Sequence, residues 1–421
     1  MPEPLSTDPY KGVRDFYPTD WARMDTIFTR MRGVLRAWGY EEYNASPLER
    51  AELYEAKTSE EIVNEQTYTF LDRGDRHVTL RPEMTPTLAR MVAHKRRELT
   101  FPLRWFSIPN VFRYERPQKG RLREHYQLNV DLVGITGSEA DIEIIRIASE
   151  LLIALGAKES DFIIRINSRS LLTAACKAAG LNADATRAYV RLLDKKAKMT
   201  PEAFAAAQGS ITVQDPLSLI DKTELENFVA TLKNRGVSNA VFDPTLTRGF
   251  DYYTDMVFEI FDTNPANPRS LFGGGRYDNL ISLFSAKGGS ASGGGDDSIP
   301  AIGFGMGDVT LIDFLETHSL LPKSDFGKPQ LFLGTPSASD IPAAQAFADT
   351  LRAEGGRVFV NLSDRALGDQ IKDAVKRGIP LFIAYGADEV TNQTVRMKIL
   401  ATGEEAGLPV SELPARLRAG S

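Results

Sequence analysis

The sequence contains one cysteine, Cys176, among 421 residues, and it has no long apolar run. A single cysteine excludes an internal disulfide framework and a cysteine-based zinc cluster. It lies in LLTAACKAAG (171–180) at helical spacing, so we expect a packed helix position rather than a reactive thiol. No apolar stretch approaches the roughly 20 residues that cross a membrane, and the N-terminal MPEPLSTDPYKG lacks the pattern of a signal peptide. These absences predict a cytoplasmic protein without a membrane segment.

The chain also lacks an excess of positive charge: it has 50 lysine and arginine residues and 56 aspartate and glutamate residues, which gives a formal net charge of −6. This balance argues against loose binding of nucleic acid over the whole surface, but it allows local basic patches. NVFRYERPQKGRLREHYQ (110–127) is such a patch, opposed between its first and last cation by Glu115 alone. It predicts an anion site, and a solvated charged loop is the alternative. Its cations are Arg113, Arg116, Lys119, Arg121 and Arg123.

Apolar periodicity predicts the order of the secondary-structure elements. Helices are expected at 19–40, 85–99 and 138–155, a hairpin at 66–83, and strands at 101–115, 124–135, 161–168 and 240–262. The basic segment then forms the loop of a second hairpin. KGGSASGGGDDS (287–298) is rich in glycine and serine and is expected to be a mobile loop.

The pattern changes after LLPKSDFGKP (320–329). Before it, hairpins and long strands predict an α+β domain at 1–325, built on an antiparallel sheet, with a helical insertion at about 169–235. After it, strand and helix patterns alternate, which predicts a separate α/β domain at 326–421 with a mainly parallel sheet. The sequence contains no GxxxxGK(S/T) phosphate loop.

The basic hairpin combines its cations with other polar side chains on strands. Side chains alternate between the two faces of a strand, so Arg113 and Glu115 are expected on one face of the first arm. Gln127 and Asp131 share a face of the returning arm by the same rule. An arginine in an otherwise apolar strand must be paired or bind an anion. We therefore expect a polar site on rigid strands, with the loop cations reaching toward a larger polyanion.

RGFDYYTDMVFE (248–259) contains a second group of polar residues. Arg248 is placed to neutralise developing negative charge, and the phenol of Tyr252 or Tyr253 to donate a hydrogen bond to a polar ring. The alternative is a pair of tyrosines at the edge of the core and a surface ion pair.

Two further features accompany these segments. LRPEMT (80–85) places Glu83 and Thr85 at the junction of a strand and a helix. LFGGGRYD (271–278) and AIGFGMG (301–307) are glycine-rich strands, which allow close backbone approach to a flat ligand unless the glycines mark a bulge.

In this order, the motifs resemble those of the histidyl-tRNA synthetases, a class II aminoacyl-tRNA synthetase family, over nearly the whole chain. KGVRDFYP (11–18) is similar to the N-terminal signature, Pro47 in SPLERAELYEA (46–56) to the dimer-forming first motif, and FRYERPQKGRLREHYQ (112–127) to the second motif. The resemblance implies ATP-dependent attachment of L-histidine to its tRNA through a histidyl-adenylate, with Mg²⁺ bridging the ATP phosphates and no metal held by the protein alone. It further implies a homodimer with a class II catalytic fold and a C-terminal domain that binds the anticodon.

The resemblance also implies roles for individual residues. Fixed cations stabilise the charge that develops on phosphoryl and acyl oxygens, and this is the main catalytic device of such enzymes. The implied catalytic pair is Arg113 and Arg248. The implied histidine-binding residues are Glu83, Met84, Thr85, Arg113, Gln127, Asp131, Arg248, Tyr252 and Tyr253. ATP is implied to contact Arg113, Glu115, Arg121 and His125, and the acceptor end of tRNA to contact Arg116 and Gln118.

Three positions depart from the family pattern. Asp131 replaces the glutamate often found at the imidazole-reading position, and His125 or Tyr126 stands where an aromatic ring often stacks on adenine. In GMGDVT (305–310), Thr310 occupies the place of the third-motif arginine that grips the γ-phosphate. Other groups must then hold the outer phosphates, or ATP activation is weak or absent. The candidates are Arg121, Arg123, Arg276, a metal held partly by Asp308, and ordering induced by tRNA.

Two other functions fit a loss of the third-motif arginine. One is a non-catalytic synthetase paralogue that regulates ATP phosphoribosyltransferase in histidine biosynthesis. The other is a tRNA-binding or amino-acid-sensing module with an inactive site. Against the first, such regulators generally lack the C-terminal domain and have degraded motifs, whereas this chain retains both RGFDYYT and RPQKGR. Histidine-dependent ATP–pyrophosphate exchange distinguishes the synthetase from both.

Overall fold

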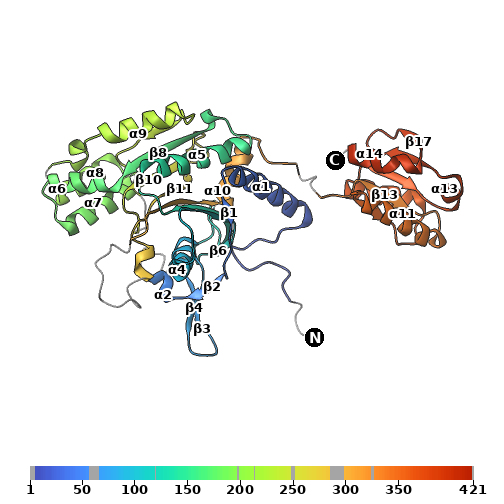
Figure 1. Cartoon of the computed structure of the whole chain (residues 1–421), viewed down its shortest axis with the longest axis horizontal. Helices are drawn as coiled ribbons and strands as arrows, with labels where there is room; N and C mark the ends of the chain where they lie inside the picture. Colours follow the sequence, from blue (N-terminus) through green and yellow to red (C-terminus); the bar gives the residue numbers. More distant parts are fainter. Residues whose placement is uncertain are drawn as a thin grey trace. The chain divides into compact units, whose positions relative to one another are not determined.

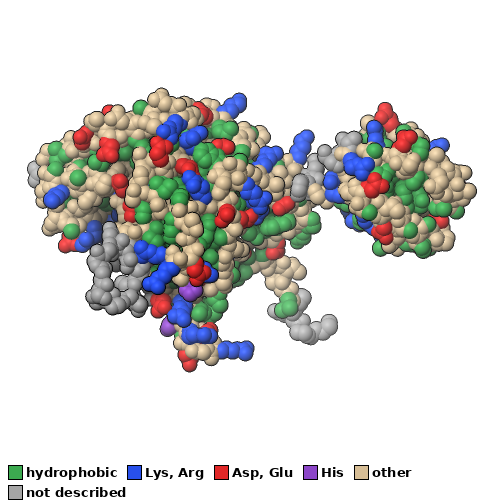
Figure 2. Space-filling model, viewed as in Figure 1, with side chains coloured by type: hydrophobic (Ala, Val, Ile, Leu, Met, Phe, Trp, Pro, Cys, Tyr) green, Lys and Arg blue, Asp and Glu red, His purple; other side chains and the backbone are tan. Residues whose placement is uncertain are grey.

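The computed structural model describes residues 5–55, 66–118, 120–196, 199–212, 214–247, 252–284, 298–323 and 327–419. The chain divides into two compact units, of which the larger contains residues 1–17 and 24–322 and the smaller residues 18–23 and 323–421. Figure 2 shows lysine and arginine side chains interspersed with aspartate and glutamate over the visible face of each unit. Among the described residues, none of the helices combines the length and apolar character of a membrane span.

The larger unit is built on a mixed, mostly antiparallel sheet, in the order β1-β5-β7-β12-β11-β10-β8-β9, with β6 paired to β7. Only the pairs β1–β5 and β8–β9 at its two edges are parallel. The prediction of an antiparallel catalytic sheet is confirmed. Its strands are β1 (Glu41–Glu42), β5 (Leu103–Ser107), β6 (Asn110–Phe112), β7 (Glu124–Val133), β8 (Phe162–Ser168), β9 (Ala240–Phe242), β10 (Met256–Asp262), β11 (Ser270–Arg276) and β12 (Ala301–Gly307).

Helices cover both faces of this sheet, and a second sheet, β2-β4-β3, stands apart from it. The helices are α1 (Pro18–Ala37), α2 (Glu52–Glu55), α4 (Thr85–Lys95), α5 (Ser138–Ala154), α6 (Arg169–Ala178), α7 (Ala183–Lys195), α8 (Pro201–Ile211), α9 (Thr223–Asn234) and α10 (Asp308–Thr317), with short turns η1 (Glu159–Asp161), η3 (Pro216–Leu219) and η4 (Ile281–Phe284). The small sheet contains β2 (Leu48–Arg50), β3 (Tyr68–Leu71) and β4 (His77–Leu80). The hairpin predicted at 66–83 is β3–β4.

Alternation along β7 separates the core from the site. Leu128, Val130 and Leu132 are buried in the main core with residues of α1, α5, α9 and α10. Gln127 and Asp131 project from the other face, because side chains alternate with period two. A smaller core on that face packs α4 against the same sheet. Figure 1 shows α5 and α9 on one side of the sheet and α4 on the other.

The predicted helical insertion is helical in the structure, but its last helix belongs elsewhere. Helices α6 and α7 and the turn η3 enclose a small core of their own, in which Cys176 is fully buried. This confirms the packed helix position expected for the cysteine. Helix α9 instead packs in the main core through Leu225, Phe228 and Leu232. The self-contained part of the insertion therefore ends before α9.

The smaller unit is a mixed α/β domain with sheet order β14-β13-β15-β16-β17. Strands β14, β13 and β15 are parallel, whereas β15–β16 and β16–β17 are antiparallel, so the expectation of a mainly parallel sheet is wrong for half of its pairs. The elements are β13 (Leu331–Gly334), η5 (Ala338–Asp340), α11 (Ile341–Ala353), β14 (Val358–Val360), α12 (Leu367–Arg377), β15 (Leu381–Ala384), α13 (Ala387–Asn392), β16 (Thr394–Ile399), β17 (Glu405–Pro409), η6 (Val410–Glu412) and α14 (Leu413–Ala419).

Candidate active site

Polar residues predicted from separate motifs line one pocket over the glycine-rich strands, which we call the histidine pocket. This pocket and the ATP pocket below are named after the ligands that the sequence predicts for their residues. Strands β7, β11 and β12 form its floor, and the start of α4 and the tyrosines before β10 form its wall. Of the residues predicted to bind histidine, six line it: Glu83, Thr85, Arg113, Gln127, Tyr252 and Tyr253. The other lining residues are Asn129, Gly273, Tyr277, Gly303, Phe304 and Gly305.

Glu83 enters the histidine pocket because a new helix begins directly after it. Helix α4 starts at Thr85, with Met84 at its N-cap and Pro86 in its first turn. Glu83 is buried and accepts a hydrogen bond from the Tyr252 hydroxyl at 2.9 Å. Burial, with the nearby Glu83 charge, raises the pKa of Tyr252 well above its ordinary value. Tyr252 therefore stays a hydroxyl donor at neutral pH. The Met84 side chain is fully buried beneath this turn.

Asp131 lies just behind the pocket wall. Its Oδ1 accepts a hydrogen bond from the Tyr277 hydroxyl at 2.5 Å, and both side chains are buried. Burial raises the Asp131 pKa to about 7, although the Tyr277 hydrogen bond opposes this rise. A methyl group on Gly303, the residue opposite Asp131 on β12, would come within 2.2 Å of that oxygen. Glycine at 303 is therefore required for the carboxyl group to occupy its place.

Gln127 carries an unsatisfied polar atom at the pocket. Its Oε1 is buried and has no hydrogen-bond partner within the described part of the chain. A buried amide oxygen without a partner is costly, and a ligand with an N–H donor would satisfy it. The neighbouring Gly305 leaves the amide its space, because a methyl group there would lie 2.7 Å from Gln127 Nε2.

Arg113 lines the histidine pocket and also a second pocket of about 390 Å³, which we call the ATP pocket. The prediction that it lies within a strand is wrong by one residue, because β6 ends at Phe112. The chain turns there, since the Glu115 N–H bonds to the Arg113 carbonyl at 2.7 Å. Arg113 and Glu115 therefore do not share one face of a strand, contrary to what the sequence predicted. Both nevertheless line the ATP pocket. Arg113 Nε donates to the Pro82 carbonyl at 2.9 Å, which fixes the guanidinium between the two pockets.

All four residues predicted to bind ATP line the ATP pocket. Arg121 Nη1 lies 3.3 Å from a Glu115 carboxylate oxygen, so the loop is tied to the turn after β6. His125 lines the pocket, whereas Tyr126 packs against Phe28 in the main core, so His125 is the ring of the two that the pocket exposes. Burial, with Arg113 and Arg14 nearby, lowers the His125 pKa to about 3. A neutral imidazole therefore faces the pocket at physiological pH.

Three other groups considered for the outer phosphates are committed elsewhere. Arg276 is buried and donates to Asp141 at 2.8 Å and to the carbonyls of 135 and 137. Arg123 donates to the Glu115 carbonyl and lies over the rings of Tyr10 and Tyr114. The Asp308 carboxylate accepts from Arg14 at 2.7 Å and from the Tyr126 N–H at 3.0 Å. Across the described segments, no group of three or more His, Cys, Asp or Glu side chains is arranged to hold a metal ion.

The remaining predicted residues lie away from these pockets or beyond what the structure describes. Arg116 and Gln118 are exposed on the loop between β6 and β7, as a contact to a macromolecule requires. The Pro47 carbonyl accepts the Arg81 N–H at 2.8 Å, next to β2. Arg248 and most of the 287–298 loop lie outside the described residues, so their predicted roles remain predictions.

Sequence reasoning missed three residues that the structure brings to the site. Asn129 lines the histidine pocket, and period-two alternation between Gln127 and Asp131 gave enough signal to find it. Tyr277 was quoted within a motif but was given no role. Arg269 lines a third pocket, described below, and no pattern in the sequence connects it to the second motif.

Comparisons with known proteins identify the family of the chain. The sequence model of the histidyl-tRNA synthetase family matches residues 12–220 and 200–304, and that of the anticodon binding domain matches 333–420. The chain is 42% identical to the histidine–tRNA ligase of Leptospira biflexa over 98% of each chain, and 36% identical to that of Opitutus terrae over 97% of each.

Solved structures show the same fold. The chain aligns with histidyl-tRNA synthetase from Nostoc sp. PCC 7120 with a TM-score of 0.78 and 22% identity, over 98% of this chain and 99% of the other. Similarity at this level of identity establishes the fold alone. The full-length relatives and the two matching family models, which together span most of the sequence, establish more: the chain belongs to the histidyl-tRNA synthetase family.

Proposed function

We propose that the protein activates L-histidine with ATP and transfers it to histidine tRNA. The chain is a histidine–tRNA ligase by its full-length similarity to such enzymes and by its C-terminal anticodon-binding domain. The observation that carries the mechanism is the position of Arg113, which lines the histidine pocket and the ATP pocket together. A group at that boundary can contact both reacting substrates.

In the first step, a carboxylate oxygen of histidine attacks the α-phosphorus of ATP. The bond from that phosphorus to the pyrophosphate oxygen breaks, and pyrophosphate leaves with its Mg²⁺. Charge spreads over the phosphoryl oxygens in the transition state, so a fixed guanidinium lowers the barrier. Arg113 supplies one guanidinium, and Arg248 is proposed to supply a second. Mg²⁺ enters with ATP as part of the substrate.

The histidine pocket selects its substrate by pairing polar groups. A neutral imidazole offers one donor and one acceptor. Tyr277, whose hydroxyl donates to Asp131, is proposed to accept from the ring N–H, and the phenol of Tyr252 or Tyr253 is proposed to contact the other ring nitrogen. Glu83, Thr85 and Gln127 are proposed to hold the ammonium group. An analogue without these groups leaves buried polar atoms unpaired, which is the strongest available basis for rejection.

In the second step, a hydroxyl of the terminal ribose of tRNA attacks the acyl carbon of the adenylate, and AMP leaves. The exposed Arg116 and Gln118 are proposed to approach the acceptor end, because they project from the loop beside the ATP pocket. Local contacts of this kind suit a chain whose overall charge is negative.

A cytoplasmic homodimer is the proposed state of the protein. Support comes from the small β2-β4-β3 sheet, which carries Pro47 beside it and exposes three large apolar side chains, Leu48, Phe70 and Leu71. Large apolar side chains exposed on a small sheet favour an interface. Light scattering should give a mass near twice the 46.5 kDa of one chain, and a mass of one chain at micromolar concentration would contradict the dimer.

Pyrophosphate exchange with purified protein is the decisive test of the proposed function. Histidine should drive the incorporation of labelled pyrophosphate into ATP, and the other amino acids should not. The assay is run with and without tRNA, so that activation that requires tRNA is detected. No histidine-dependent exchange under either condition would contradict the ligase. Binding to an ATP phosphoribosyltransferase would then favour the regulatory paralogue, but the anticodon-binding domain argues against it.

A further inference from the structure

Thr310 stands at the position of the third-motif arginine, and its side chain packs helix α10 against the sheet. Thr310 lies in the first turn of α10, and its hydroxyl donates to the Leu271 carbonyl at 2.7 Å. That bond joins α10 to β11, so the Thr310 side chain serves the contact between helix and strand. It offers no cation to a phosphate.

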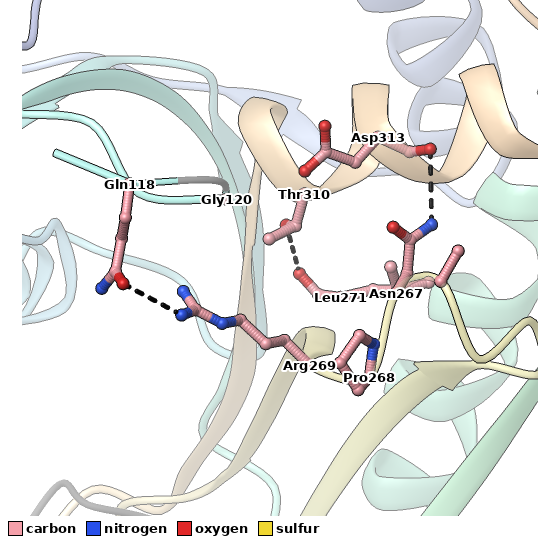
Figure 3. A pocket seen from close by; sticks show the side chains of 9 residues that line it. Gln118, Gly120, Asn267, Pro268, Arg269, Leu271, Thr310 and Asp313 are labelled. Atoms are coloured by element: carbon pink, nitrogen blue, oxygen red, sulfur yellow. Dashed lines mark hydrogen bonds between the residues drawn. The ribbon is translucent and has the colours of Figure 1, made fainter.

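Arg269 brings a guanidinium to the same place from another element. A methyl group built on Gly120, in the second-motif loop, would lie 3.7 Å from Thr310 Cγ2 and 3.9 Å from Arg269 Nη1. The same methyl group would lie 3.9 Å from Asp313 Oδ2, so Thr310, the Arg269 guanidinium and the Asp313 carboxylate all approach one point of that loop. Arg269 Nη2 also donates to Gln118 Oε1 at 3.3 Å. Figure 3 shows the Arg269 side chain extended from the turn before β11 toward Gln118, with Thr310 on the facing helix.

Arg269 lines a third pocket, of about 390 Å³, that continues the ATP pocket. Three residues line both pockets, namely Gly120, Leu271 and Thr310. The ATP pocket in turn shares Arg113 with the histidine pocket. The three pockets therefore follow one another. If histidine fills the first and the α-phosphate lies at Arg113, the outer phosphates reach the space beside Thr310 and Arg269.

We propose that Arg269 binds the outer phosphates of ATP and so replaces the arginine that position 310 lacks. The proposal rests on the proposed ligase function and names a further substrate-binding residue for it. Within the third pocket, Arg269 is the only cation among the described lining residues, and Asp313 is the only anion. Arg276 and Arg123 point their guanidinium groups into other contacts, as described above, whereas Arg121 lines the ATP pocket and Arg269 the pocket that continues it.

The turn that carries Arg269 is well anchored. Asn267 is buried, and its amide donates to Asp262 at 2.8 Å and to Thr317 Oγ1 at 2.9 Å. Pro268 restricts the backbone between Asn267 and Arg269. Strand β11 begins at the next residue. The backbone that carries Arg269 is therefore held in position before ATP arrives, which favours a binding role for the residue.

The test compares steady-state pyrophosphate exchange by the full chain and by Arg269→Ala. The KM for ATP should rise by about 10- to 100-fold, because a charge-assisted contact to phosphate is lost. The KM for histidine should stay within about twofold, since Arg269 does not line the histidine pocket. Arg187→Ala is the matched control, because Arg187 pairs with Asp184 on the exposed face of α7. Arg269 is exposed, so its truncation leaves the core intact.

A second variant makes the test sharper. Thr310→Arg in the Arg269→Ala background should bring the KM for ATP back toward that of the parent, because it returns a guanidinium to the same space from α10. Arg269→Ala with an unchanged KM for ATP would overturn the proposal. Aminoacylation assays of the same variants give the KM for tRNA, and a rise confined to that KM would also overturn the proposal, because it would assign Arg269 with Gln118 to the acceptor end. If the unsubstituted chain shows no histidine-dependent exchange, the proposed ligase function itself fails. That outcome is distinguishable from an unchanged KM for ATP and from a rise in the KM for tRNA, because both of these require an active parent.

Discussion

Replacing Arg113 with alanine is expected to slow histidine-dependent ATP–pyrophosphate exchange by about a thousandfold, mainly through kcat. Arg113 lies at the boundary of the histidine and ATP pockets, where the carboxylate must meet the α-phosphate. Its Nε bond to the Pro82 carbonyl is the guanidinium's one hydrogen bond within the described segments, so the terminal nitrogens are available to substrate. Negative charge spreads over the phosphoryl oxygens in the transition state, and the loss should therefore exceed any loss of ground-state binding.

The measurement separates transition-state stabilisation from binding. Pyrophosphate exchange gives kcat and KM, and equilibrium titration gives the affinity for histidine. Arg113→Lys keeps the charge without the planar fork and should recover part of the rate. Arg235→Ala, which breaks an exposed ion pair with Glu139, is the control and should match the parent. If Arg113→Ala weakens histidine binding as much as it slows exchange, Arg113 holds the substrate and does not act in the transition state.

Much of the site follows from local sequence patterns. Period-two alternation places Gln127 and Asp131 on one face of β7, and the strand–helix junction at Thr85 directs Glu83 toward the same pocket. The choice between His125 and Tyr126 did not follow from the pattern, because both residues lie near the start of a strand and either face was open. Packing of Tyr126 against Phe28 of α1 decided it.

Other features depend on contacts between distant parts of the chain. Gln118 and Arg269 are 151 positions apart and meet only when β7 and β11 join the same sheet. No sequence period encodes that contact. The C-terminal strand β17 (Glu405–Pro409) was missed for a different reason: its residues are mostly exposed and lack apolar alternation, so its pairing with β16 rather than its sequence defines it.

Replacing Asp131 with asparagine should weaken histidine recognition and at the same time stabilise the fold. The KM for histidine should rise about a hundredfold, because the amide cannot act as the anionic acceptor behind Tyr277. In the parent, the KM should also rise as pH falls below about 7, where Asp131 takes up a proton. The substrate imidazole titrates in both proteins, so the ratio of their KM values isolates Asp131. A ratio that does not change between pH 6 and pH 8 would contradict this role.

The effect on stability has a sign that the raised pKa determines. Burial raises the Asp131 pKa from 3.8 to about 7, so between these values the folded chain holds more protons than the unfolded chain. Stability of the parent therefore falls as pH rises through this window, by about 4 kcal/mol in total. Asparagine keeps an acceptor for Tyr277 but does not ionise, so Asp131→Asn should unfold at higher urea than the parent at pH 8, and its advantage should be much smaller at pH 4.5. If the urea midpoints of Asp131→Asn and the parent differed by the same amount at both pH values, ionisation of the Asp131 carboxyl group would cost the fold little. Tyr277→Phe should enlarge the pH dependence instead, because it removes a hydrogen bond that favours the carboxylate. A smaller pH dependence of stability in Asp131→Asn, together with a larger one in Tyr277→Phe, would identify a carboxylate that is held in the core for substrate recognition at the expense of stability.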